Sequence, residues 1–180
     1  MPAHRSHLVS AAAGDALAVS LAALRKTLEL PGEFSPEVLA EAEAAARNVS
    51  TDPRVAGVTD LREIEFLTIH PAGSLDLDQA MHFERTASGA VLHYAIADVP
   101  AFVEPGGAVD AEARLRGQTL YAADGRIPLH PPALSEDAAS LSPGVDRRAF
   151  VWRFTLDHEA RPIETTLTRA VIRSRRRWRC

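Results

Sequence analysis

The chain has 180 residues, of which 46% are hydrophobic and 24% charged, and its formal net charge is −4. This length is enough for one domain with a real core, or for one small domain with an appendage. The acidic balance excludes a globally basic nucleic-acid binder, although a locally basic groove remains open. The single cysteine, Cys180, excludes a disulfide framework and a cysteine-based zinc site.

The first residues combine basic side chains with small and apolar ones, as a secretory signal would. Asp15 interrupts the apolar part, so a helix is the better interpretation. No apolar run approaches the roughly 18 residues that a membrane span requires. We therefore expect a cytoplasmic protein that makes no membrane contact.

Two helices are predicted before residue 50. The first carries a stripe of leucines at helical spacing: Leu17, Leu21, Leu24 and Leu28. Pro31-Gly32 ends it, and Ser35-Pro36-Glu37 begins the second helix with an N-cap serine, a proline and an acid near the positive end of the dipole. Residues 48–60 are expected to be a linker. The segment 1–60 is thus predicted to be helical, with packing or adaptor roles and no chemistry of its own.

From Leu61 onward the sequence is typical of strands. A hairpin is predicted from residues 81–85 and 91–97, joined at Ser88-Gly89. Further elements are expected as a short helix at 109–116 and strands at 119–121, 150–156 and 163–172. Helices followed mostly by strands indicate an α+β fold, with N-terminal helices and then a mostly antiparallel, twisted β-sheet.

The stretch TIHPAGSLDLDQAMH, residues 68–82, holds the candidate chemistry. A short apolar strand leads into a turn, after which Asp76 and Asp78 alternate around Leu77. In an extended segment residues i and i+2 share a face, so the two carboxylates can converge. Such a pair repels unless a proton or a metal intervenes, and Mg²⁺ prefers oxygen ligands. A turn with solvated acids is the alternative for this pattern taken alone.

Several segments, taken in order, resemble the catalytic RNB domain of the ribonuclease II / ribonuclease R family. They are DLREIEFLTIHPAGSLDLDQA, HYAIADVPAFVEPGG, VDAEARLRGQTLYAADGRIPLHPPALSEDAASLSPGVDRRAF and FTLDHEARP. The resemblance is collinear from about Asp60 to Leu156. It implies a metal-dependent 3′→5′ exoribonuclease that releases nucleoside monophosphates from single-stranded RNA, with Mg²⁺ or Mn²⁺ as cofactor. It also implies that residues 61–180 are an incomplete RNB domain, which a second chain could complete.

The resemblance assigns roles to four residues of the turn. Asp76 and Asp78 fall on two of the four family aspartates, and Asp78 matches the one most directly tied to catalysis. His70 and Gln79 stand at the other two positions, so all four are candidate metal ligands. Histidine suits transition metals better than Mg²⁺, and a glutamine oxygen is neutral, so weakened Mg²⁺ binding is expected. A structural role for His70 and a spectator role for Gln79 are the alternatives.

Two more features bear on RNA. Tyr121 falls where the family has a tyrosine that stacks on a nucleotide near the 3′ end, an interaction of about 1–3 kcal/mol; its alternative is a core or rim aromatic. The arginine run at 173–179 could contact phosphates, but we favour an unfolded basic tail. Two hypotheses of function follow: an RNB-type exoribonuclease with impaired activity, or a catalytically inactive fragment that retains at most RNA binding.

Overall fold

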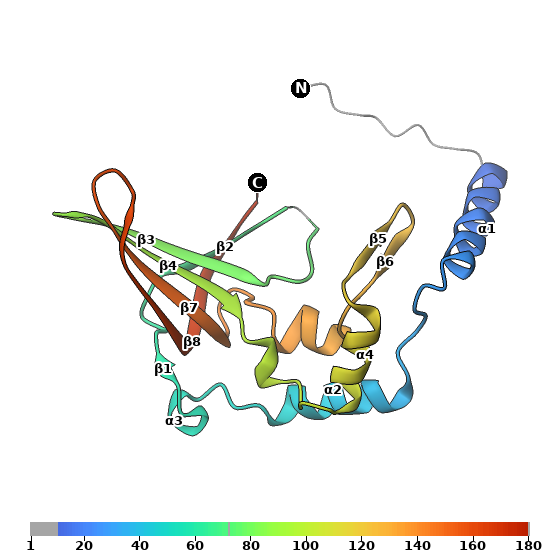
Figure 1. Ribbon diagram of the computed structural model, residues 1–180, viewed down its shortest axis with the longest axis horizontal. Coiled ribbons are helices and arrows are strands. Elements are labelled where there is room, and N and C mark those ends of the chain that lie inside the picture. Colours follow the sequence, from blue (N-terminus) through green and yellow to red (C-terminus); the bar gives the residue numbers. More distant parts are fainter. Residues whose placement is uncertain (1–10, 72, 180) are drawn as a thin grey trace. The chain divides into compact units, whose positions relative to one another are not determined.

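The computed structural model describes residues 11–71 and 73–179 (Figure 1). Within these residues the chain divides into two compact units. The smaller comprises residues 11–33 with Arg116–Leu129, and the larger comprises Phe34–Leu115 with residues 130–179. In the described part of the chain, no helix combines the length and apolarity needed to cross a membrane.

The smaller unit contains one helix and one hairpin. Helix α1 (Ala11–Thr27) leads the unit, and strands β5 (Leu120–Ala122) and β6 (Gly125–Ile127) form the hairpin. An ion pair between Arg25 and Asp124 joins the helix to the hairpin turn. Leu17 and Leu24 of α1 are each more than half exposed, and the packing or adaptor role expected of this helix stays a prediction.

Five strands of the larger unit close into a barrel. They are β2 (Phe66–His70), β3 (Gln79–Thr86), β4 (Gly89–Ala97), β7 (Asp146–Leu156) and β8 (Pro162–Arg179). The order is β8-β2-β3-β4-β7, and β7 pairs back onto β8 to close the ring. Only the β2–β8 pairing within this ring is parallel. The mostly antiparallel sheet of an α+β fold, predicted from the sequence, is thereby confirmed.

The interior of the barrel is filled mainly by small side chains. The buried cluster consists of Phe66, Ala80, Ala95, Ala97, Leu141, Ala149, Val151, Ala170 and Ile172. Successive residues of a strand point to opposite faces, so the larger side chains that alternate with these alanines lie on the outside. A ring of five strands is narrow, and alanine at facing positions lets it close.

The β3–β4 hairpin has the turn that Ser88-Gly89 predicts, and glycine is required there. Gly89 has φ +141°, and a Cβ at this position would lie 2.1 Å from the main-chain oxygen of Leu156. The neighbouring strand β7 therefore approaches the hairpin more closely than any side chain would permit.

A second core lies between helices of the same unit. Helix α2 (Pro36–Asn48), helix α4 (Ala108–Arg116), the 3₁₀ turn η1 (Val99–Ala101) and the wide helical turn η2 (Ala133–Ala138) surround it. Ser35 caps α2 as predicted, its Oγ accepting from the Val38 amide at 3.3 Å. Glu41 of α2 accepts from the amides of Ala108 and Val109 at 2.7 and 3.1 Å, which fixes the start of α4.

Two segments differ from the sequence expectation. The expected linker contains a short helix, α3 (Pro53–Ala56), and a strand, β1 (Thr59–Asp60), that pairs with β8. The second difference is larger: β8 continues to Arg179, so the prediction of an unfolded basic tail is wrong for residues 173–179. This segment of β8 pairs with the main-chain N–H and C=O groups along one edge of β2. The gain from this pairing outweighs the weak strand preference of arginine. Residues 1–10 and Cys180 lie outside the described residues.

Candidate functional site

The acidic turn connects β2 to β3 and is anchored by Leu77. This side chain is buried, its amide donates to Ser140 Oγ at 3.1 Å, and its carbonyl accepts from the Leu141 amide at 2.7 Å. The next carbonyl, that of Asp78, accepts from the Ala97 amide at 2.9 Å. The end of the turn is thus held in an extended conformation by two other segments of the larger unit.

Anchoring of Leu77 presents the flanking carboxylates outward, as the alternation of the sequence predicts. The Asp78 side chain is 61% exposed, and Asp76 is half-buried. His70, the last residue of β2, is buried, and its Nε2 lies 3.9 Å from Asp78 Oδ1. The same nitrogen lies 3.3 Å from the main-chain oxygen of Gln79. His70 therefore bridges the two ends of the turn, which agrees with the structural alternative for this residue.

The Gln79 side chain is also engaged. The Tyr94 hydroxyl of β4 donates to Gln79 Oε1 at 2.5 Å. This oxygen is the atom that would replace a carboxylate oxygen at a metal, and the contact with Tyr94 uses one of its two lone pairs. Tyr94 was not singled out by the sequence, because a pair 15 positions apart leaves no local signal.

The donor set falls short of a preformed metal centre. Among residues 11–71 and 73–179, no group of three or more His, Cys, Asp or Glu side chains is arranged to hold a metal ion. His70 and Gln79 are turned towards partners within the protein. Asp78 is mostly exposed, and its carboxylate and that of Asp76 together bring two negative charges to one turn.

Arg177 of β8 is a further contact of the turn that the sequence did not predict. Its Nη2 donates to the Pro71 carbonyl at 2.7 Å. Arg177 is the register partner of Thr68 in the parallel β2–β8 pair. Its guanidinium therefore reaches the end of β2 at which the acidic turn begins. The signal was present as the arginine run, but it was attributed to a tail.

Tyr121 belongs to the smaller unit. It lies in β5 opposite Arg126 of β6, and its side chain is 75% exposed. This exposure is inconsistent with the core alternative and leaves the ring accessible to a planar ligand. The role of Tyr121 as an RNA contact stays a prediction.

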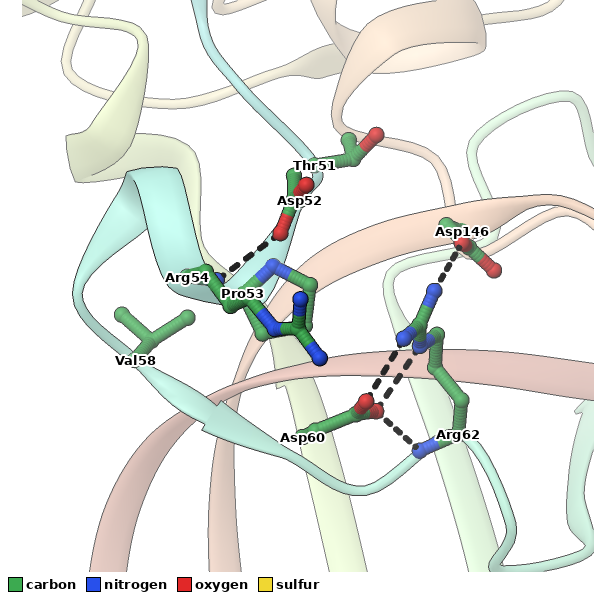
Figure 2. A pocket seen from close by; sticks show the side chains of 8 residues that line it. All are labelled: Thr51, Asp52, Pro53, Arg54, Val58, Asp60, Arg62 and Asp146. Atoms are coloured by element: carbon green, nitrogen blue, oxygen red, sulfur yellow. Dashed lines mark hydrogen bonds and ion pairs between the residues drawn. The ribbon is translucent and has the colours of Figure 1, made fainter.

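A separate hollow of about 560 Å³ lies beside α3, β1 and the start of β7 (Figure 2). Its lining residues are Thr51, Asp52, Pro53, Arg54, Val58, Asp60, Arg62 and Asp146. Figure 2 shows Arg62 between two carboxylates: it donates to Asp60 Oδ2 at 2.6 Å and to Asp146 Oδ2 at 3.1 Å. The hydrogen bonds from Arg62 lower the pKa of Asp60 to about 2. Arg62 forms ion pairs with Asp60 and Asp146, so the lining of the hollow is an ion-paired contact between β1 and β7.

Comparison with known proteins agrees with the resemblance in the sequence. Residues 58–179 match the RNB domain. Ribonuclease R of Acidithiobacillus ferrooxidans is 36% identical over 149 residues, which are 83% of this chain and 34% of that protein. A protein of Arabidopsis thaliana named inactive exonuclease DIS3L2 is 41% identical over 116 residues, 64% of this chain and 11% of its own length.

The fold agrees as well. Mycoplasma genitalium RNase R, solved in complex with double-stranded RNA, superimposes with a TM-score of 0.81 and 27% identity. The match covers 90% of this chain and 29% of that one. The chain belongs to the RNB domain family, within the ribonuclease II / ribonuclease R group. It spans about a third or less of the length of these relatives.

Proposed function

We propose that the chain engages the 3′ end of single-stranded RNA at the acidic turn and hydrolyses it as a 3′→5′ exoribonuclease with strongly reduced turnover. The observation that carries this proposal is the exposed carboxylate of Asp78, which is presented by an anchored turn inside the RNB match. A relative named ribonuclease R supports RNA as the substrate class. Nucleoside 5′-monophosphates would be the products.

The proposal gives the turn residues different tasks. Asp76 and Asp78 would hold Mg²⁺ or Mn²⁺, and the cation would supply Lewis-acid stabilisation of the reacting phosphate and an activated water. His70 keeps the turn closed through its contact with the Gln79 carbonyl. The exposed Tyr121 would stack on a base near the 3′ end. Reduced turnover follows because two carboxylates match the charge of the cation less well than four.

A second candidate, RNA binding without hydrolysis, is favoured by one specific observation. Gln79 Oε1 already accepts a hydrogen bond from Tyr94, so the position gives a metal no charge and at most one lone pair of a neutral oxygen. The name of the Arabidopsis relative, inactive exonuclease, records a lack of exonuclease activity in another protein of the family. A partner chain that completes the domain and a cytoplasmic location stay predictions of the sequence.

Purified chain incubated with 3′-labelled single-stranded RNA and MgCl₂ or MnCl₂ tests both candidates. We expect slow release of labelled nucleoside monophosphate, abolished by Asp78→Asn and unchanged by Glu65→Gln. Glu65 is a suitable control because it is exposed and its carboxylate makes no ion pair within the described residues. Binding of the RNA without any release would select the second candidate. Absence of both binding and release would contradict the two together.

A further inference from the structure

An exposed tryptophan and two arginines gather on the outside of the barrel beside β2. Trp178 is 58% exposed and is the register partner of Ile69, which is 42% exposed. Arg175 and Arg176 precede it on the same strand and are both exposed. We call Ile69, Arg175, Arg176 and Trp178 the Trp178 face.

A bulge in β8 creates this arrangement. Phe66 pairs with Ser174, whereas Leu67 pairs with Arg176, so Arg175 is one extra residue on β8. Strict alternation from the buried Ser174 would place Arg176 inside the barrel and Arg177 outside. The bulge reverses this order. It turns Arg176 and Trp178 outward and brings Arg175 to the same side.

The charges of the two arginines are not compensated. Within the described residues, the Arg176 side chain makes no hydrogen bond or ion pair. Arg175 donates to the main-chain oxygen of Arg62 at 2.9 Å, and it contacts no carboxylate of the described residues. Arg173, two residues earlier, differs because its Nε lies 2.7 Å from Asp146 Oδ1. The Trp178 face is therefore a positive patch on a chain whose net charge is −4.

We propose that the Trp178 face binds single-stranded RNA, with a base stacked on Trp178 and phosphates held by Arg175 and Arg176. An indole offers a stacking surface to any base, and adjacent cations bind a polyanion through release of its counterions. An apolar protein partner would cover Ile69 and Trp178 but would leave both arginine charges unmatched. The choice of RNA over another polyanion rests on the proposed function.

The register gives this face a place along the RNA path. Ile69 pairs with Trp178, and the next residue of β2, His70, ends the strand and lies 3.9 Å from Asp78. A strand stacked on Trp178 thus lies along the barrel wall next to the start of the acidic turn. The Trp178 face would hold the part of the RNA that lies on the 5′ side of the nucleotide bound at the acidic turn.

Binding of a fluorescein-labelled U₁₂ oligoribonucleotide, followed by anisotropy at several salt concentrations, tests the proposal on the full chain. Trp178→Leu keeps an apolar side chain but removes the stacking surface, and we expect it to weaken binding at least fivefold. Trp178→Phe should retain most of the affinity. Arg176→Gln should weaken binding and reduce the slope of log K against log salt by about 0.7. The matched control is Arg85→Gln, an exposed arginine at the hairpin end of β3, which should change neither.

Intrinsic fluorescence adds a direct readout, because the chain has two tryptophans, Trp152 and Trp178. In a Trp152→Phe background, U₁₂ should quench the emission of Trp178. Unquenched emission together with native affinity of Trp178→Leu would overturn the proposal while leaving the proposed function intact. A native chain that binds no U₁₂ would contradict both. Emission that changes with protein concentration without RNA, and oligomers lost in Trp178→Leu, would identify a protein interface and overturn the proposal.

Discussion

Asp78 and Asp98 lie on neighbouring strand ends of the barrel and have opposite environments. The carbonyl of Asp78 accepts from the amide of Ala97, the residue before Asp98. Asp98 is fully buried, and its carboxylate accepts from Arg169 at 2.8 and 3.0 Å, with Arg148 at 3.3 Å. Asp78 is mostly exposed, and His70 Nε2 lies 3.9 Å from its Oδ1.

The difference separates a buried acid that holds the barrel together from an acid whose carboxylate is exposed to solvent. A buried charge must be compensated within the protein: Arg169 balances the Asp98 carboxylate, and Arg148 adds a second cation at the same group. Arg169 also lies over the Phe150 ring, 5.0 Å from its centroid, which ties the ion pair to the outer wall. An exposed carboxylate has no such task. Its charge is available to a cation or to the solvent.

Replacing the buried acid should have the largest effect. Asp98→Ala leaves Arg148 without its partner in a site where it is 12% exposed, and we expect a loss of about 3 kcal/mol in the free energy of unfolding. Asp78→Ala, the matched exposed change, should alter the free energy of unfolding by less than about 0.5 kcal/mol. Urea unfolding followed by circular dichroism measures both. Equal losses in the two variants would contradict the division between a structural, buried aspartate and an exposed one that the fold does not need.

Placing aspartates at positions 70 and 79 should turn the acidic turn into a stronger cation site. In His70→Asp/Gln79→Asp, four acids share the turn, and we expect Mg²⁺ to bind roughly tenfold more tightly, about 1.4 kcal/mol. The repulsion should lower the melting temperature in EDTA, and millimolar MgCl₂ should raise it again by mass action. The native chain should respond little.

Sodium chloride at the same ionic strength separates specific binding from screening in this experiment. If it raises the melting temperature of the double variant as much as MgCl₂ does, the turn does not form a magnesium site even with four acids. A magnesium-specific rise would show that the turn itself is competent and that His70 and Gln79 set the limit.

The sequence predicted the parts of this comparison that depend on local chemistry. Leu77 between two aspartates indicated the outward carboxylates, and Ser88-Gly89 indicated the hairpin that places β4 beside β3. The sequence does not indicate the buried ion pair of Asp98, because its partner Arg169 lies 71 positions away. The arginines of β8 were assigned to a tail for the same reason. Their strand partner, β2, is more than 100 positions earlier in the chain, and no local pattern reports that pairing.

Tyr94→Phe should have a smaller effect than either change above. It removes the hydroxyl that donates to Gln79 Oε1, and a hydrogen bond at an accessible site contributes about 0.5–1 kcal/mol. The same substitution in a Gln79→Ala background should cost less, because the acceptor is already absent. A double-mutant cycle by urea unfolding measures the coupling. Equal costs in the two backgrounds would mean that Tyr94 does not hold the glutamine in solution.

The smallest expected effect concerns the ion pair of Asp60 with Arg62. Asp60 has an arginine partner, as Asp98 has, but its side chain is partly exposed to solvent. Arg62 lowers the pKa of Asp60 from 3.8 to about 2. Because the folded-state pKa is depressed, this pair stabilises the protein fully above pH 4 and progressively less as the pH falls from 4 to 2. The side chains are partly exposed, so screening keeps the contribution small. Urea midpoints measured between pH 5 and 2.5 should therefore fall slightly less steeply in Asp60→Asn than in Glu65→Gln. Identical slopes would show that water, rather than Arg62, compensates Asp60.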